Sequence, residues 1–303
     1  MVKHLVRNFF ILLGLLLVIA IVLSLTGNGH ILEGLPQTYF RGLTKPDIDD
    51  FRYSDTRPIA IAKEKKRAWD KASSAYSNSL SEKDVQYHEG LGSTAFLVTV
   101  GNEIVFEQYW EDYDSTTISN SFSMAKSFTA MCIMRAQEDG LLSVQDPVCK
   151  YLPRFCDGKN SELTIEHLLK MTSNINFGES YSNPFGYQAK AYYNDDLFSL
   201  TAPYLVEKKA GSVWKYQGGD TVILHELLEK VTGKTLAGYF SEKIWQAIGA
   251  EHEAYWGLDD DHGKEKAFSA VYATARDFAK VGQLFRNKGQ LANGESALQG
   301  SSL

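Results

Sequence analysis

The most prominent feature of the hydrophobic pattern is an apolar N-terminus. Residues 9–25 carry no charge and follow two basic residues, Lys3 and Arg7. A run of about 17 apolar residues reaches the lower limit for crossing a bilayer and exceeds the usual core of a secretion signal. Because the basic residues come first, the positive-inside rule places the tail in the cytoplasm and the remainder of the chain outside. The pattern favours an uncleaved membrane anchor within residues 1–30 over a cleaved signal, and either one exports the rest.

Residues 31–90 are mostly polar and separate the apolar run from the remainder of the chain. The part from 31 to 62 contains prolines and acidic residues, and it predicts an extended lead away from the membrane. The charged segment 62–80 has the composition of a surface helix. This region therefore predicts a connection and not a domain of its own.

Strand-like patterning begins at residue 93. The runs 93–100 and 103–110 are rich in β-branched and aromatic residues, and they flank Gly101-Asn102, a strong hairpin signal. A third short extended piece is expected just before residue 121. The sequence therefore predicts a hairpin at the start of a domain that occupies residues 91–303.

Helical periodicity dominates the rest of this domain. Helices are expected over residues 124–140, 163–173, 220–250 and 274–289. Thr164 is expected to cap the second helix, and Thr232-Gly233 is expected to break the third into two. A hairpin followed by many helices predicts the α+β class.

Composition and charge exclude several classes of protein. The chain has 303 residues, of which 44% are hydrophobic and 22% charged, as in ordinary folded proteins. A net charge of −6 without a Lys/Arg stripe argues against nucleic-acid binding. The cysteines are Cys132, Cys149 and Cys156. The last two could pair across a short loop, but free buried thiols are the favoured interpretation, and without a Cys-x-x-Cys pair no structural zinc is expected.

The segment SFSMAK at 121–126 carries candidate chemistry. Ser123 and Lys126 are three positions apart at the start of a predicted helix, so hydroxyl and amine share a face. A lysine can accept the proton of a serine nucleophile if its surroundings lower its pKa by roughly 3 units, about 4 kcal/mol. The same spacing recurs at Ser212 and Lys215, but in a stretch that predicts a turn and strand, where the side chains would face opposite ways. Spacing alone supports a nucleophile and a simple helix N-cap equally for Ser123.

A wider set of segments resembles a known family. SFSMAKSFTA, LLSVQDPVCKYLPRF, LTIEHLLKMTS, AGSVWKYQGGD and EKAFSAVYATARDFAKVGQLFRNKG together resemble the serine β-lactamases and penicillin-binding proteins, over about residues 90 to 290. The nearest likeness is to the class C-like branch, with its esterases and aminohexanoate-dimer hydrolases. The resemblance implies a β-lactamase/DD-peptidase-like fold, with an antiparallel sheet packed against a mostly helical domain. It also implies that Ser123 is acylated, that Lys126 accepts its proton, and that Tyr216 shares the proton and protonates the leaving group, without a metal or organic cofactor.

Two departures from the family pattern limit what it implies. The family's tyrosine motif falls on residues 216–218 and usually ends in Asn or Ser, but here Gly218 offers only backbone, which leaves esters and small amides as the favoured substrates. The family's Lys-Thr-Gly or His-x-Gly strand does not follow; His88-Glu89-Gly90 matches the letters but precedes the hairpin. We therefore expect a fragment or truncated product of a longer hydrolase, with an incomplete sheet and an open edge beside the hairpin. A complete five-stranded sheet within these residues would refute this expectation.

Three other motifs are given structural interpretations. TGKT at 232–235 is expected to be a helix–helix turn, because Leu228 stands where a phosphate loop needs glycine. HELLE, which begins at His225, is expected to form a charged helix face, because Glu229 replaces the second histidine of a zinc protease. DDDHG at 259–263 could attract a cation but is expected to be a solvated acidic loop.

The favoured function is a membrane-anchored, exported serine hydrolase. It would act through an acyl-enzyme on the ester, amide or β-lactam carbonyl of a small molecule, at the bacterial cytoplasmic membrane with the globular domain outside. The alternative is a catalytically inactive envelope protein that keeps the fold as a binding or scaffolding module, as Gly218 and the missing strand suggest. The substrate cannot be derived, because the aromatic segment 176–196, which supplies part of the cleft wall, gives no indication of what it selects.

Overall fold

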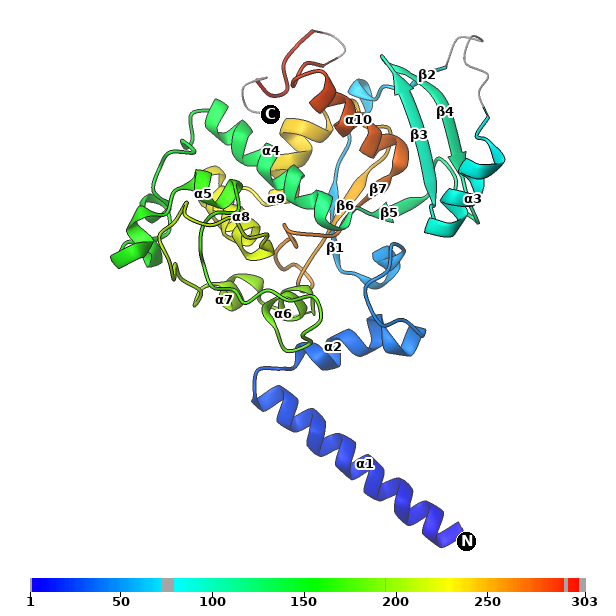
Figure 1. The fold of residues 1–303 in the computed structure, drawn as a ribbon, viewed down its shortest axis with the longest axis vertical. Helices are drawn as coiled ribbons and strands as arrows, with labels where there is room; N and C mark the ends of the chain where they lie inside the picture. Colours follow the sequence, from blue (N-terminus) through cyan, green and yellow to red (C-terminus); the bar gives the residue numbers. More distant parts are fainter. Residues whose placement is uncertain (1, 72–78, 194, 292–293, 300–303) are drawn as a thin grey trace.

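The computed structural model describes residues 2–71, 79–193, 195–291 and 294–299 (Figure 1). Its helices are α1 (Val2–Leu25), α2 (His30–Gln37), α3 (Glu82–Leu91), α4 (Ala125–Glu138), α5 (Ile165–Leu169), α6 (Tyr187–Tyr193), α7 (Leu197–Thr201), α8 (Gly218–Thr232), α9 (Leu236–Phe240) and α10 (Ala275–Arg286). Its strands are β1 (Thr56–Ile59), β2 (Asp70–Lys71), β3 (Ala95–Val100), β4 (Glu103–Tyr109), β5 (Ile118–Asn120), β6 (Ala254–Gly257) and β7 (Val271–Thr274). This mixture of helices and largely antiparallel strands confirms the α+β class.

The N-terminal helix α1 projects away from the folded body, and its apolar side chains are exposed along its whole length (Figure 1). It is long and apolar enough to cross a membrane, with a mean hydropathy of 2.8 over its most apolar window. Helix α2 follows at once and packs on α6, where a side chain at Gly34 would meet the ring of Tyr193 at 3.3 Å. The expected extended lead over residues 31–62 is therefore wrong in part, since it begins with a helix docked on the body.

The strands form two separate sheets. One has the order β1-β6-β7-β5 with every pair antiparallel, and the other has the order β2-β4-β3, in which the β3–β4 hairpin turns at Gly101 with φ +59°. Within the described residues, no strand pairs with the outer edge of β3, so the expected open edge beside the hairpin is present. The sequence missed β1, β6 and β7, which are only four residues long each; β6 and β7 are nearly all buried, whereas only Ile59 is buried in β1.

The core lies between the four-stranded sheet and the helices. Helix α8 is buried from Gly218 to Leu228 except at Glu226, and it packs against α4, α5 and α7. Aromatic residues fill the space beside α4: Phe240 stacks on Phe128 at 5.5 Å between ring centroids and meets Trp256 edge-on at 5.7 Å. Burying each such side chain contributes about 1.5–3 kcal/mol before packing. This core fixes the N-terminal end of α4 against the sheet.

Most predicted helix ends are confirmed. The Thr164 side chain accepts a hydrogen bond from the His167 N–H in a capping box at α5. Helix α8 ends with Gly233 as its C-cap, in the left-handed region at φ +66°, and Thr235 is the N-cap of α9. Residues 232–235 are therefore the expected helix–helix turn, because the missing β-carbon lets glycine reverse the chain there.

The predicted surface helix over residues 62–80 is wrong where it can be checked. Residues 63–65 form one 3₁₀ turn, and the next residues run extended into β2, while residues 72–78 lie outside the described part. Tertiary contacts override the helical composition: the Trp69 indole donates to the Arg276 carbonyl at 3.1 Å, and the Arg67 N–H donates to the Gly249 carbonyl. The charged helix instead lies at α3.

The cysteine interpretation is also corrected. Cys149 and Cys156 form a disulfide, with their Cα atoms 4.7 Å apart, whereas free thiols had been favoured. Two successive 3₁₀ turns, Val148–Lys150 and Pro153–Phe155, fold back on each other and bring the two sulfurs together. Cys132 is free and buried in α4, as expected.

Candidate active site

The candidate nucleophile lies on a tight turn at the start of α4. Ser123 occupies a one-turn 3₁₀ helix, Phe122–Met124, and its side chain is exposed. Phe122 adopts φ +44°, a backbone conformation that is unfavourable for any residue with a β-carbon. The Asn120 side chain stabilises this conformation by accepting a hydrogen bond from the Phe122 N–H at 2.8 Å. Backbone strain of this kind is concentrated at functional sites, and here it presents the hydroxyl at a helix N-terminus.

Lys126 faces that hydroxyl from the next turn of α4. Its Nζ lies 3.2 Å from the Ser123 Oγ and donates to the Phe268 carbonyl at 2.8 Å. Only 8% of the residue is exposed, and this burial lowers the pKa of Lys126 from its ordinary value, an effect opposed by Tyr216 and Glu179. A lysine in such a position is suited to accept a proton.

The other candidate serines are arranged differently. The Ser121 hydroxyl accepts from the Val271 N–H at 3.1 Å and so ties the turn to β7. Ser127 is exposed in the first turn of α4. Ser212 donates to the Lys209 carbonyl at 2.7 Å within a turn, so the second Ser-x-x-Lys match has a local structural role.

Tyr216 comes from the segment before α8 and completes the predicted group. The Lys126 Nζ lies 4.9 Å from the centroid of its ring, and the side chain is 38% exposed. The Lys215 N–H donates to the Met171 carbonyl at 2.9 Å, which holds the segment against the loop after α5. The structure therefore brings together the three residues singled out from the sequence: Ser123, Lys126 and Tyr216.

Glu179 is a site residue that the sequence reasoning missed. Both of its carboxylate oxygens accept from the Gly218 N–H, at 2.8 and 2.7 Å. A β-carbon at Gly218 would lie 2.9 Å from Glu179 Oε1, so the departure from Asn or Ser at this position makes room for the carboxylate. Burial raises the pKa of Glu179, while the Gly218 N–H and Lys126 act to lower it. Glu179 lies in the segment 176–196, which was expected to form part of the cleft wall, but no spacing signal pointed to this residue.

A buried polar network supports the start of α8. Ser173 donates to Asp220 Oδ1 at 2.6 Å and accepts from the Gln217 amide at 3.3 Å. Asp220 is fully buried, and burial raises its pKa to about 8. This carboxyl group is therefore protonated at neutral pH, and it lies in the first turn of α8, directly after the Tyr216 segment.

A cavity of about 900 Å³ opens beside Ser123. Its walls come from the segment that includes α2, from the nucleophile turn, from the loop and helix at 180–193, and from Phe268 and Ser269. Aromatic and aliphatic side chains dominate the lining: Ile31, Leu35, Tyr39, Leu43, Ile48, Phe122, Tyr181, Tyr192, Tyr193 and Phe268. A cavity that combines an apolar lining with polar groups, Ser123 among them, is typical of a small-molecule site.

Of the remaining motifs, one agrees with its structural interpretation and two are corrected in part. His88 lies in α3, and its ring packs against the rings of Phe96 and Trp110. This packing role agrees with the interpretation of His88-Glu89-Gly90 as a chance match to His-x-Gly. The expected solvated loop at 259–263 is wrong for Asp259, whose carboxylate is half-buried and accepts the Leu197 N–H at 2.7 Å, while Asp260 is exposed as expected. The expected charged face at HELLE is wrong for His225, which is completely buried in α8.

Comparisons with known proteins identify the relatives of this chain. Residues 80–302 match the family model described as Beta-lactamase. The chain is 24% identical over 217 residues to the 6-aminohexanoate-dimer hydrolase of Paenarthrobacter ureafaciens, covering 68% of this chain and 55% of that protein. It spans about half the length of the first curated relatives, with shares of 55%, 42% and 44%.

Solved structures share the fold. A Bacillus anthracis protein named as a 6-aminohexanoate-dimer hydrolase superposes with a TM-score of 0.72 at 22% identity, covering 84% of this chain and 71% of that one. The octameric penicillin-binding protein homologue from Pyrococcus abyssi superposes with a TM-score of 0.55 at 20% identity, covering 73% and 58%. Since the family model matches most of the chain and these structures share its fold, the chain belongs to the β-lactamase family.

Proposed function

We propose that this protein is a serine hydrolase in which Ser123 forms an acyl-enzyme. The Ser123 Oγ attacks a substrate carbonyl as its proton passes to the neutral amine of Lys126. Collapse of the tetrahedral intermediate expels the leaving group, which takes a proton through Tyr216. Water then hydrolyses the acyl-serine ester, releases the acid and restores the hydroxyl. The observation that carries the proposal is the 3.2 Å approach of a buried lysine amine to an exposed serine hydroxyl.

The electrostatics of the site support these roles. An amine works as a base only when deprotonated, and burial lowers the pKa of Lys126 toward that condition. The negative charge that develops on the substrate oxygen falls near the N-terminus of α4, where the helix dipole stabilises it. The apolar cavity beside Ser123 would exclude water from the acyl group of a small ester or amide.

The location of the protein is part of the proposal. Helix α1 has the length and hydropathy of a membrane anchor, and basic residues precede its apolar run. We place α1 in the cytoplasmic membrane of a bacterium and the hydrolase domain on the outer side of that membrane. The cavity would then lie close to the bilayer, because α2 both follows α1 and forms part of its wall.

Covalent labelling tests the assignment. A fluorophosphonate probe should label the wild-type protein and Ser127→Ala, the matched control at the exposed serine next to Lys126 in α4, but not Ser123→Ala. Circular dichroism should give the same spectrum for all three proteins, because Ser123 and Ser127 are both exposed. Labelling of Ser123→Ala at the wild-type level would remove the basis of the proposal.

The alternative is a binding protein that has kept the fold without turnover. Gly218 lacks the side chain that usually ends the tyrosine motif, and the β3 edge is unpaired within the described residues. Hydrolysis of a p-nitrophenyl ester separates the two functions: turnover that is lost in Lys126→Ala supports an enzyme. Binding of the ester without turnover in wild type and variant alike would support the binding protein.

A further inference from the structure

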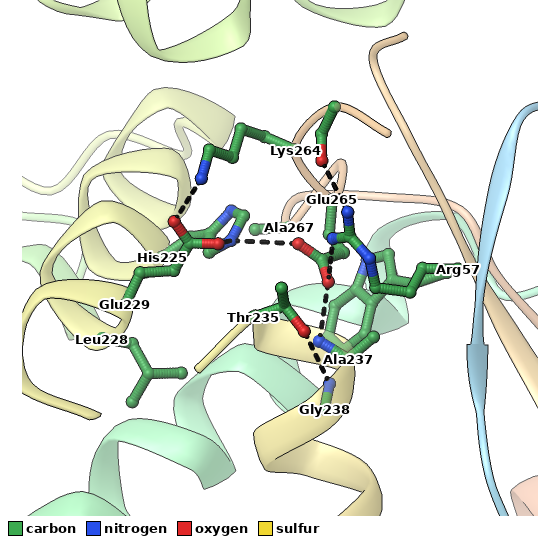
Figure 2. A network of polar contacts seen from close by, with 12 residues as sticks. Arg57, His225, Leu228, Glu229, Thr235, Ala237, Gly238, Lys264, Glu265 and Ala267 are labelled. Atoms are coloured by element: carbon green, nitrogen blue, oxygen red, sulfur yellow. Dashed lines mark hydrogen bonds and ion pairs between the residues drawn. The ribbon is translucent and has the colours of Figure 1, made fainter. Parts of the chain in front are cut away.

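A second cluster of ionisable residues lies in the core, away from Ser123. His225 and Glu229 occupy successive turns of α8, and Glu265 lies on the connection between β6 and β7 (Figure 2). The His225 Nε2 is 3.4 Å from Glu229 Oε1 and 3.3 Å from Glu265 Oε2, and these three atoms all lie within 4.8 Å of one another. His225 and Glu265 are completely buried. Figure 2 shows the imidazole between the two carboxylates.

The facing atoms lack hydrogen-bond partners, although the outer atoms of both carboxylates are satisfied. Glu265 Oε1 accepts from the Ala237 N–H at 2.9 Å and lies 2.7 Å from the Arg57 guanidinium, and Glu229 Oε2 accepts from Lys264 at 2.5 Å. Among the described residues, His225 Nε2, Glu229 Oε1 and Glu265 Oε2 make no hydrogen bond of acceptable geometry. Buried polar atoms without well-aligned partners cost free energy, and a positive charge between them, either a proton on His225 or a metal ion, would remove that cost.

We propose that His225, Glu229 and Glu265 bind a zinc ion. Zinc bonds histidine nitrogen and carboxylate oxygen at about 2.0–2.2 Å in tetrahedral sites, which sets neighbouring ligand atoms about 3.3–3.6 Å apart. The two contacts made by His225 Nε2, at 3.3 and 3.4 Å, have this spacing. The site contains no cysteine, and so it is not a zinc site of the Cys-x-x-Cys type.

The fourth ligand would be water. A cavity of about 570 Å³ is lined by Glu229, Lys264 and Phe198, and it is more open to solvent than the cavity beside Ser123. The Glu229 side chain retains 17% exposure, but its Oε1 is buried, and so Glu229 separates this cavity from the cluster. A movement of the Glu229 side chain would open an entry path for the ion and bring in the water.

The charges around the cluster are compatible with a cation. Arg57 and Lys264 already neutralise the two carboxylates, and a bound dication adds positive charge. Lys264 can relieve this excess by turning into solvent, since 40% of its side chain is exposed. A proton on His225 is the competing occupant of the same position.

The proposed ion would also support the candidate active site. Glu265 stands three residues before Phe268, whose carbonyl accepts from Lys126, and two before Ala267, whose carbonyl accepts from Thr129 in α4. Zinc would fix this segment to α8, and thereby fix the acceptor that orients the Lys126 amine. Its role is structural, since none of its ligands contacts Ser123, Lys126 or Tyr216 among the described interactions.

Metal analysis of the full chain tests the proposal. The protein is purified in detergent, its affinity tag is removed, and it is treated with EDTA. On addition of zinc it should then bind about one zinc ion per chain, measured by inductively coupled plasma mass spectrometry, and its Tm should rise. Cobalt should replace zinc and give the intense visible absorption of a tetrahedral site. Glu229→Gln should weaken zinc binding at least about tenfold, and the exposed His262→Asn should not.

The competing occupant makes a different prediction. If a proton on His225 fills the cluster, zinc will leave Tm unchanged at pH 7 and no cobalt band will appear, and the proposal is then overturned. Because the wild-type measurements alone decide between zinc and proton, failure of His225 or Glu265 variants to fold does not affect the outcome.

Discussion

At the scale of single residues, Gly218 and Glu179 define how this site departs from its family. The missing side chain at 218 admits a carboxylate that bonds the first N–H of α8 and interacts with Lys126. A negative charge near the amine favours its protonated form, and so Glu179 works against the burial that lowers the Lys126 pKa. The balance between burial on one side and Tyr216 and Glu179 on the other sets the pH at which the proposed base becomes active.

The pH dependence of hydrolysis should reveal this balance. Glu179→Gln removes the negative charge, so the Lys126 pKa falls further and the acid limb of kcat/KM against pH should move to lower pH by up to about one unit. Gly218→Ala should shift the limb in the same direction, because its β-carbon would displace the carboxylate. The matched control is Gly282→Ala in α10, where a β-carbon meets nothing within 4 Å. An unchanged profile in Glu179→Gln would contradict this account of the site.

Asp220 makes a separate prediction about stability. Burial raises its pKa to about 8, above the value of about 4 expected in the unfolded chain, so the folded state binds more protons between these values. The stability that protonated Asp220 contributes is therefore fully present below about pH 4 and is lost as pH rises through about 8. Asp220→Asn mimics the protonated group and should gain Tm relative to wild type between pH 5 and pH 9, measured by thermal unfolding. A constant difference in Tm over this range would show that Asp220 titrates normally.

At the scale of elements, the elements that local signals determine were predicted correctly, and those that depend on tertiary contacts were missed. Gly101-Asn102, Thr164 and Gly233 marked the hairpin and two helix ends correctly, because each acts through its own backbone geometry. The four-residue strands carry too little pattern to be read alone. The extended course near Trp69 depends on a carbonyl in α10, more than 200 residues further along the chain.

The same division applies to the candidate site. Ser123 and Lys126 lie one turn apart, so helical spacing alone brought them together, and Tyr216 required the family pattern. Glu179 and the His225–Glu265 contact depend on how distant segments pack, and no spacing in the sequence records that packing. The Cys149–Cys156 bond was open to prediction, but composition alone could not decide it.

Helix α2 makes a prediction at this scale because it is both a linker and a wall of the cavity. It rests on α6 through Gly34, where a β-carbon would lie 3.3 Å from the Tyr193 ring. Gly34→Leu should push α2 outward and raise KM for a p-nitrophenyl ester. The Lys126-dependent kcat should stay within about twofold of the wild-type value, because the reacting groups lie on other elements. Leu32→Ala on the same helix, a residue that does not line the cavity, is the control. A large loss of kcat with KM unchanged would argue against a wall role.

At the scale of the whole molecule, α1 is separable from the folded body. None of its side chains is buried, and α2 is the element that it contacts most. Removal of residues 2–25 should therefore release the protein from the membrane fraction on centrifugation while fluorophosphonate labelling of Ser123 persists. Persistence of the shortened protein in washed membranes would mean that another surface also binds lipid.

The position of α2 has a consequence for how substrates arrive. With α1 embedded, Tyr39 and Phe40, the latter 77% exposed, follow α2 at the level where aromatic rings settle among lipid headgroups. Tyr39 also lines the cavity, so the entrance lies at that same depth. A molecule partitioned into the outer leaflet would then reach Ser123 by lateral diffusion in two dimensions, and its surface density, not its aqueous concentration, would set the rate of encounter.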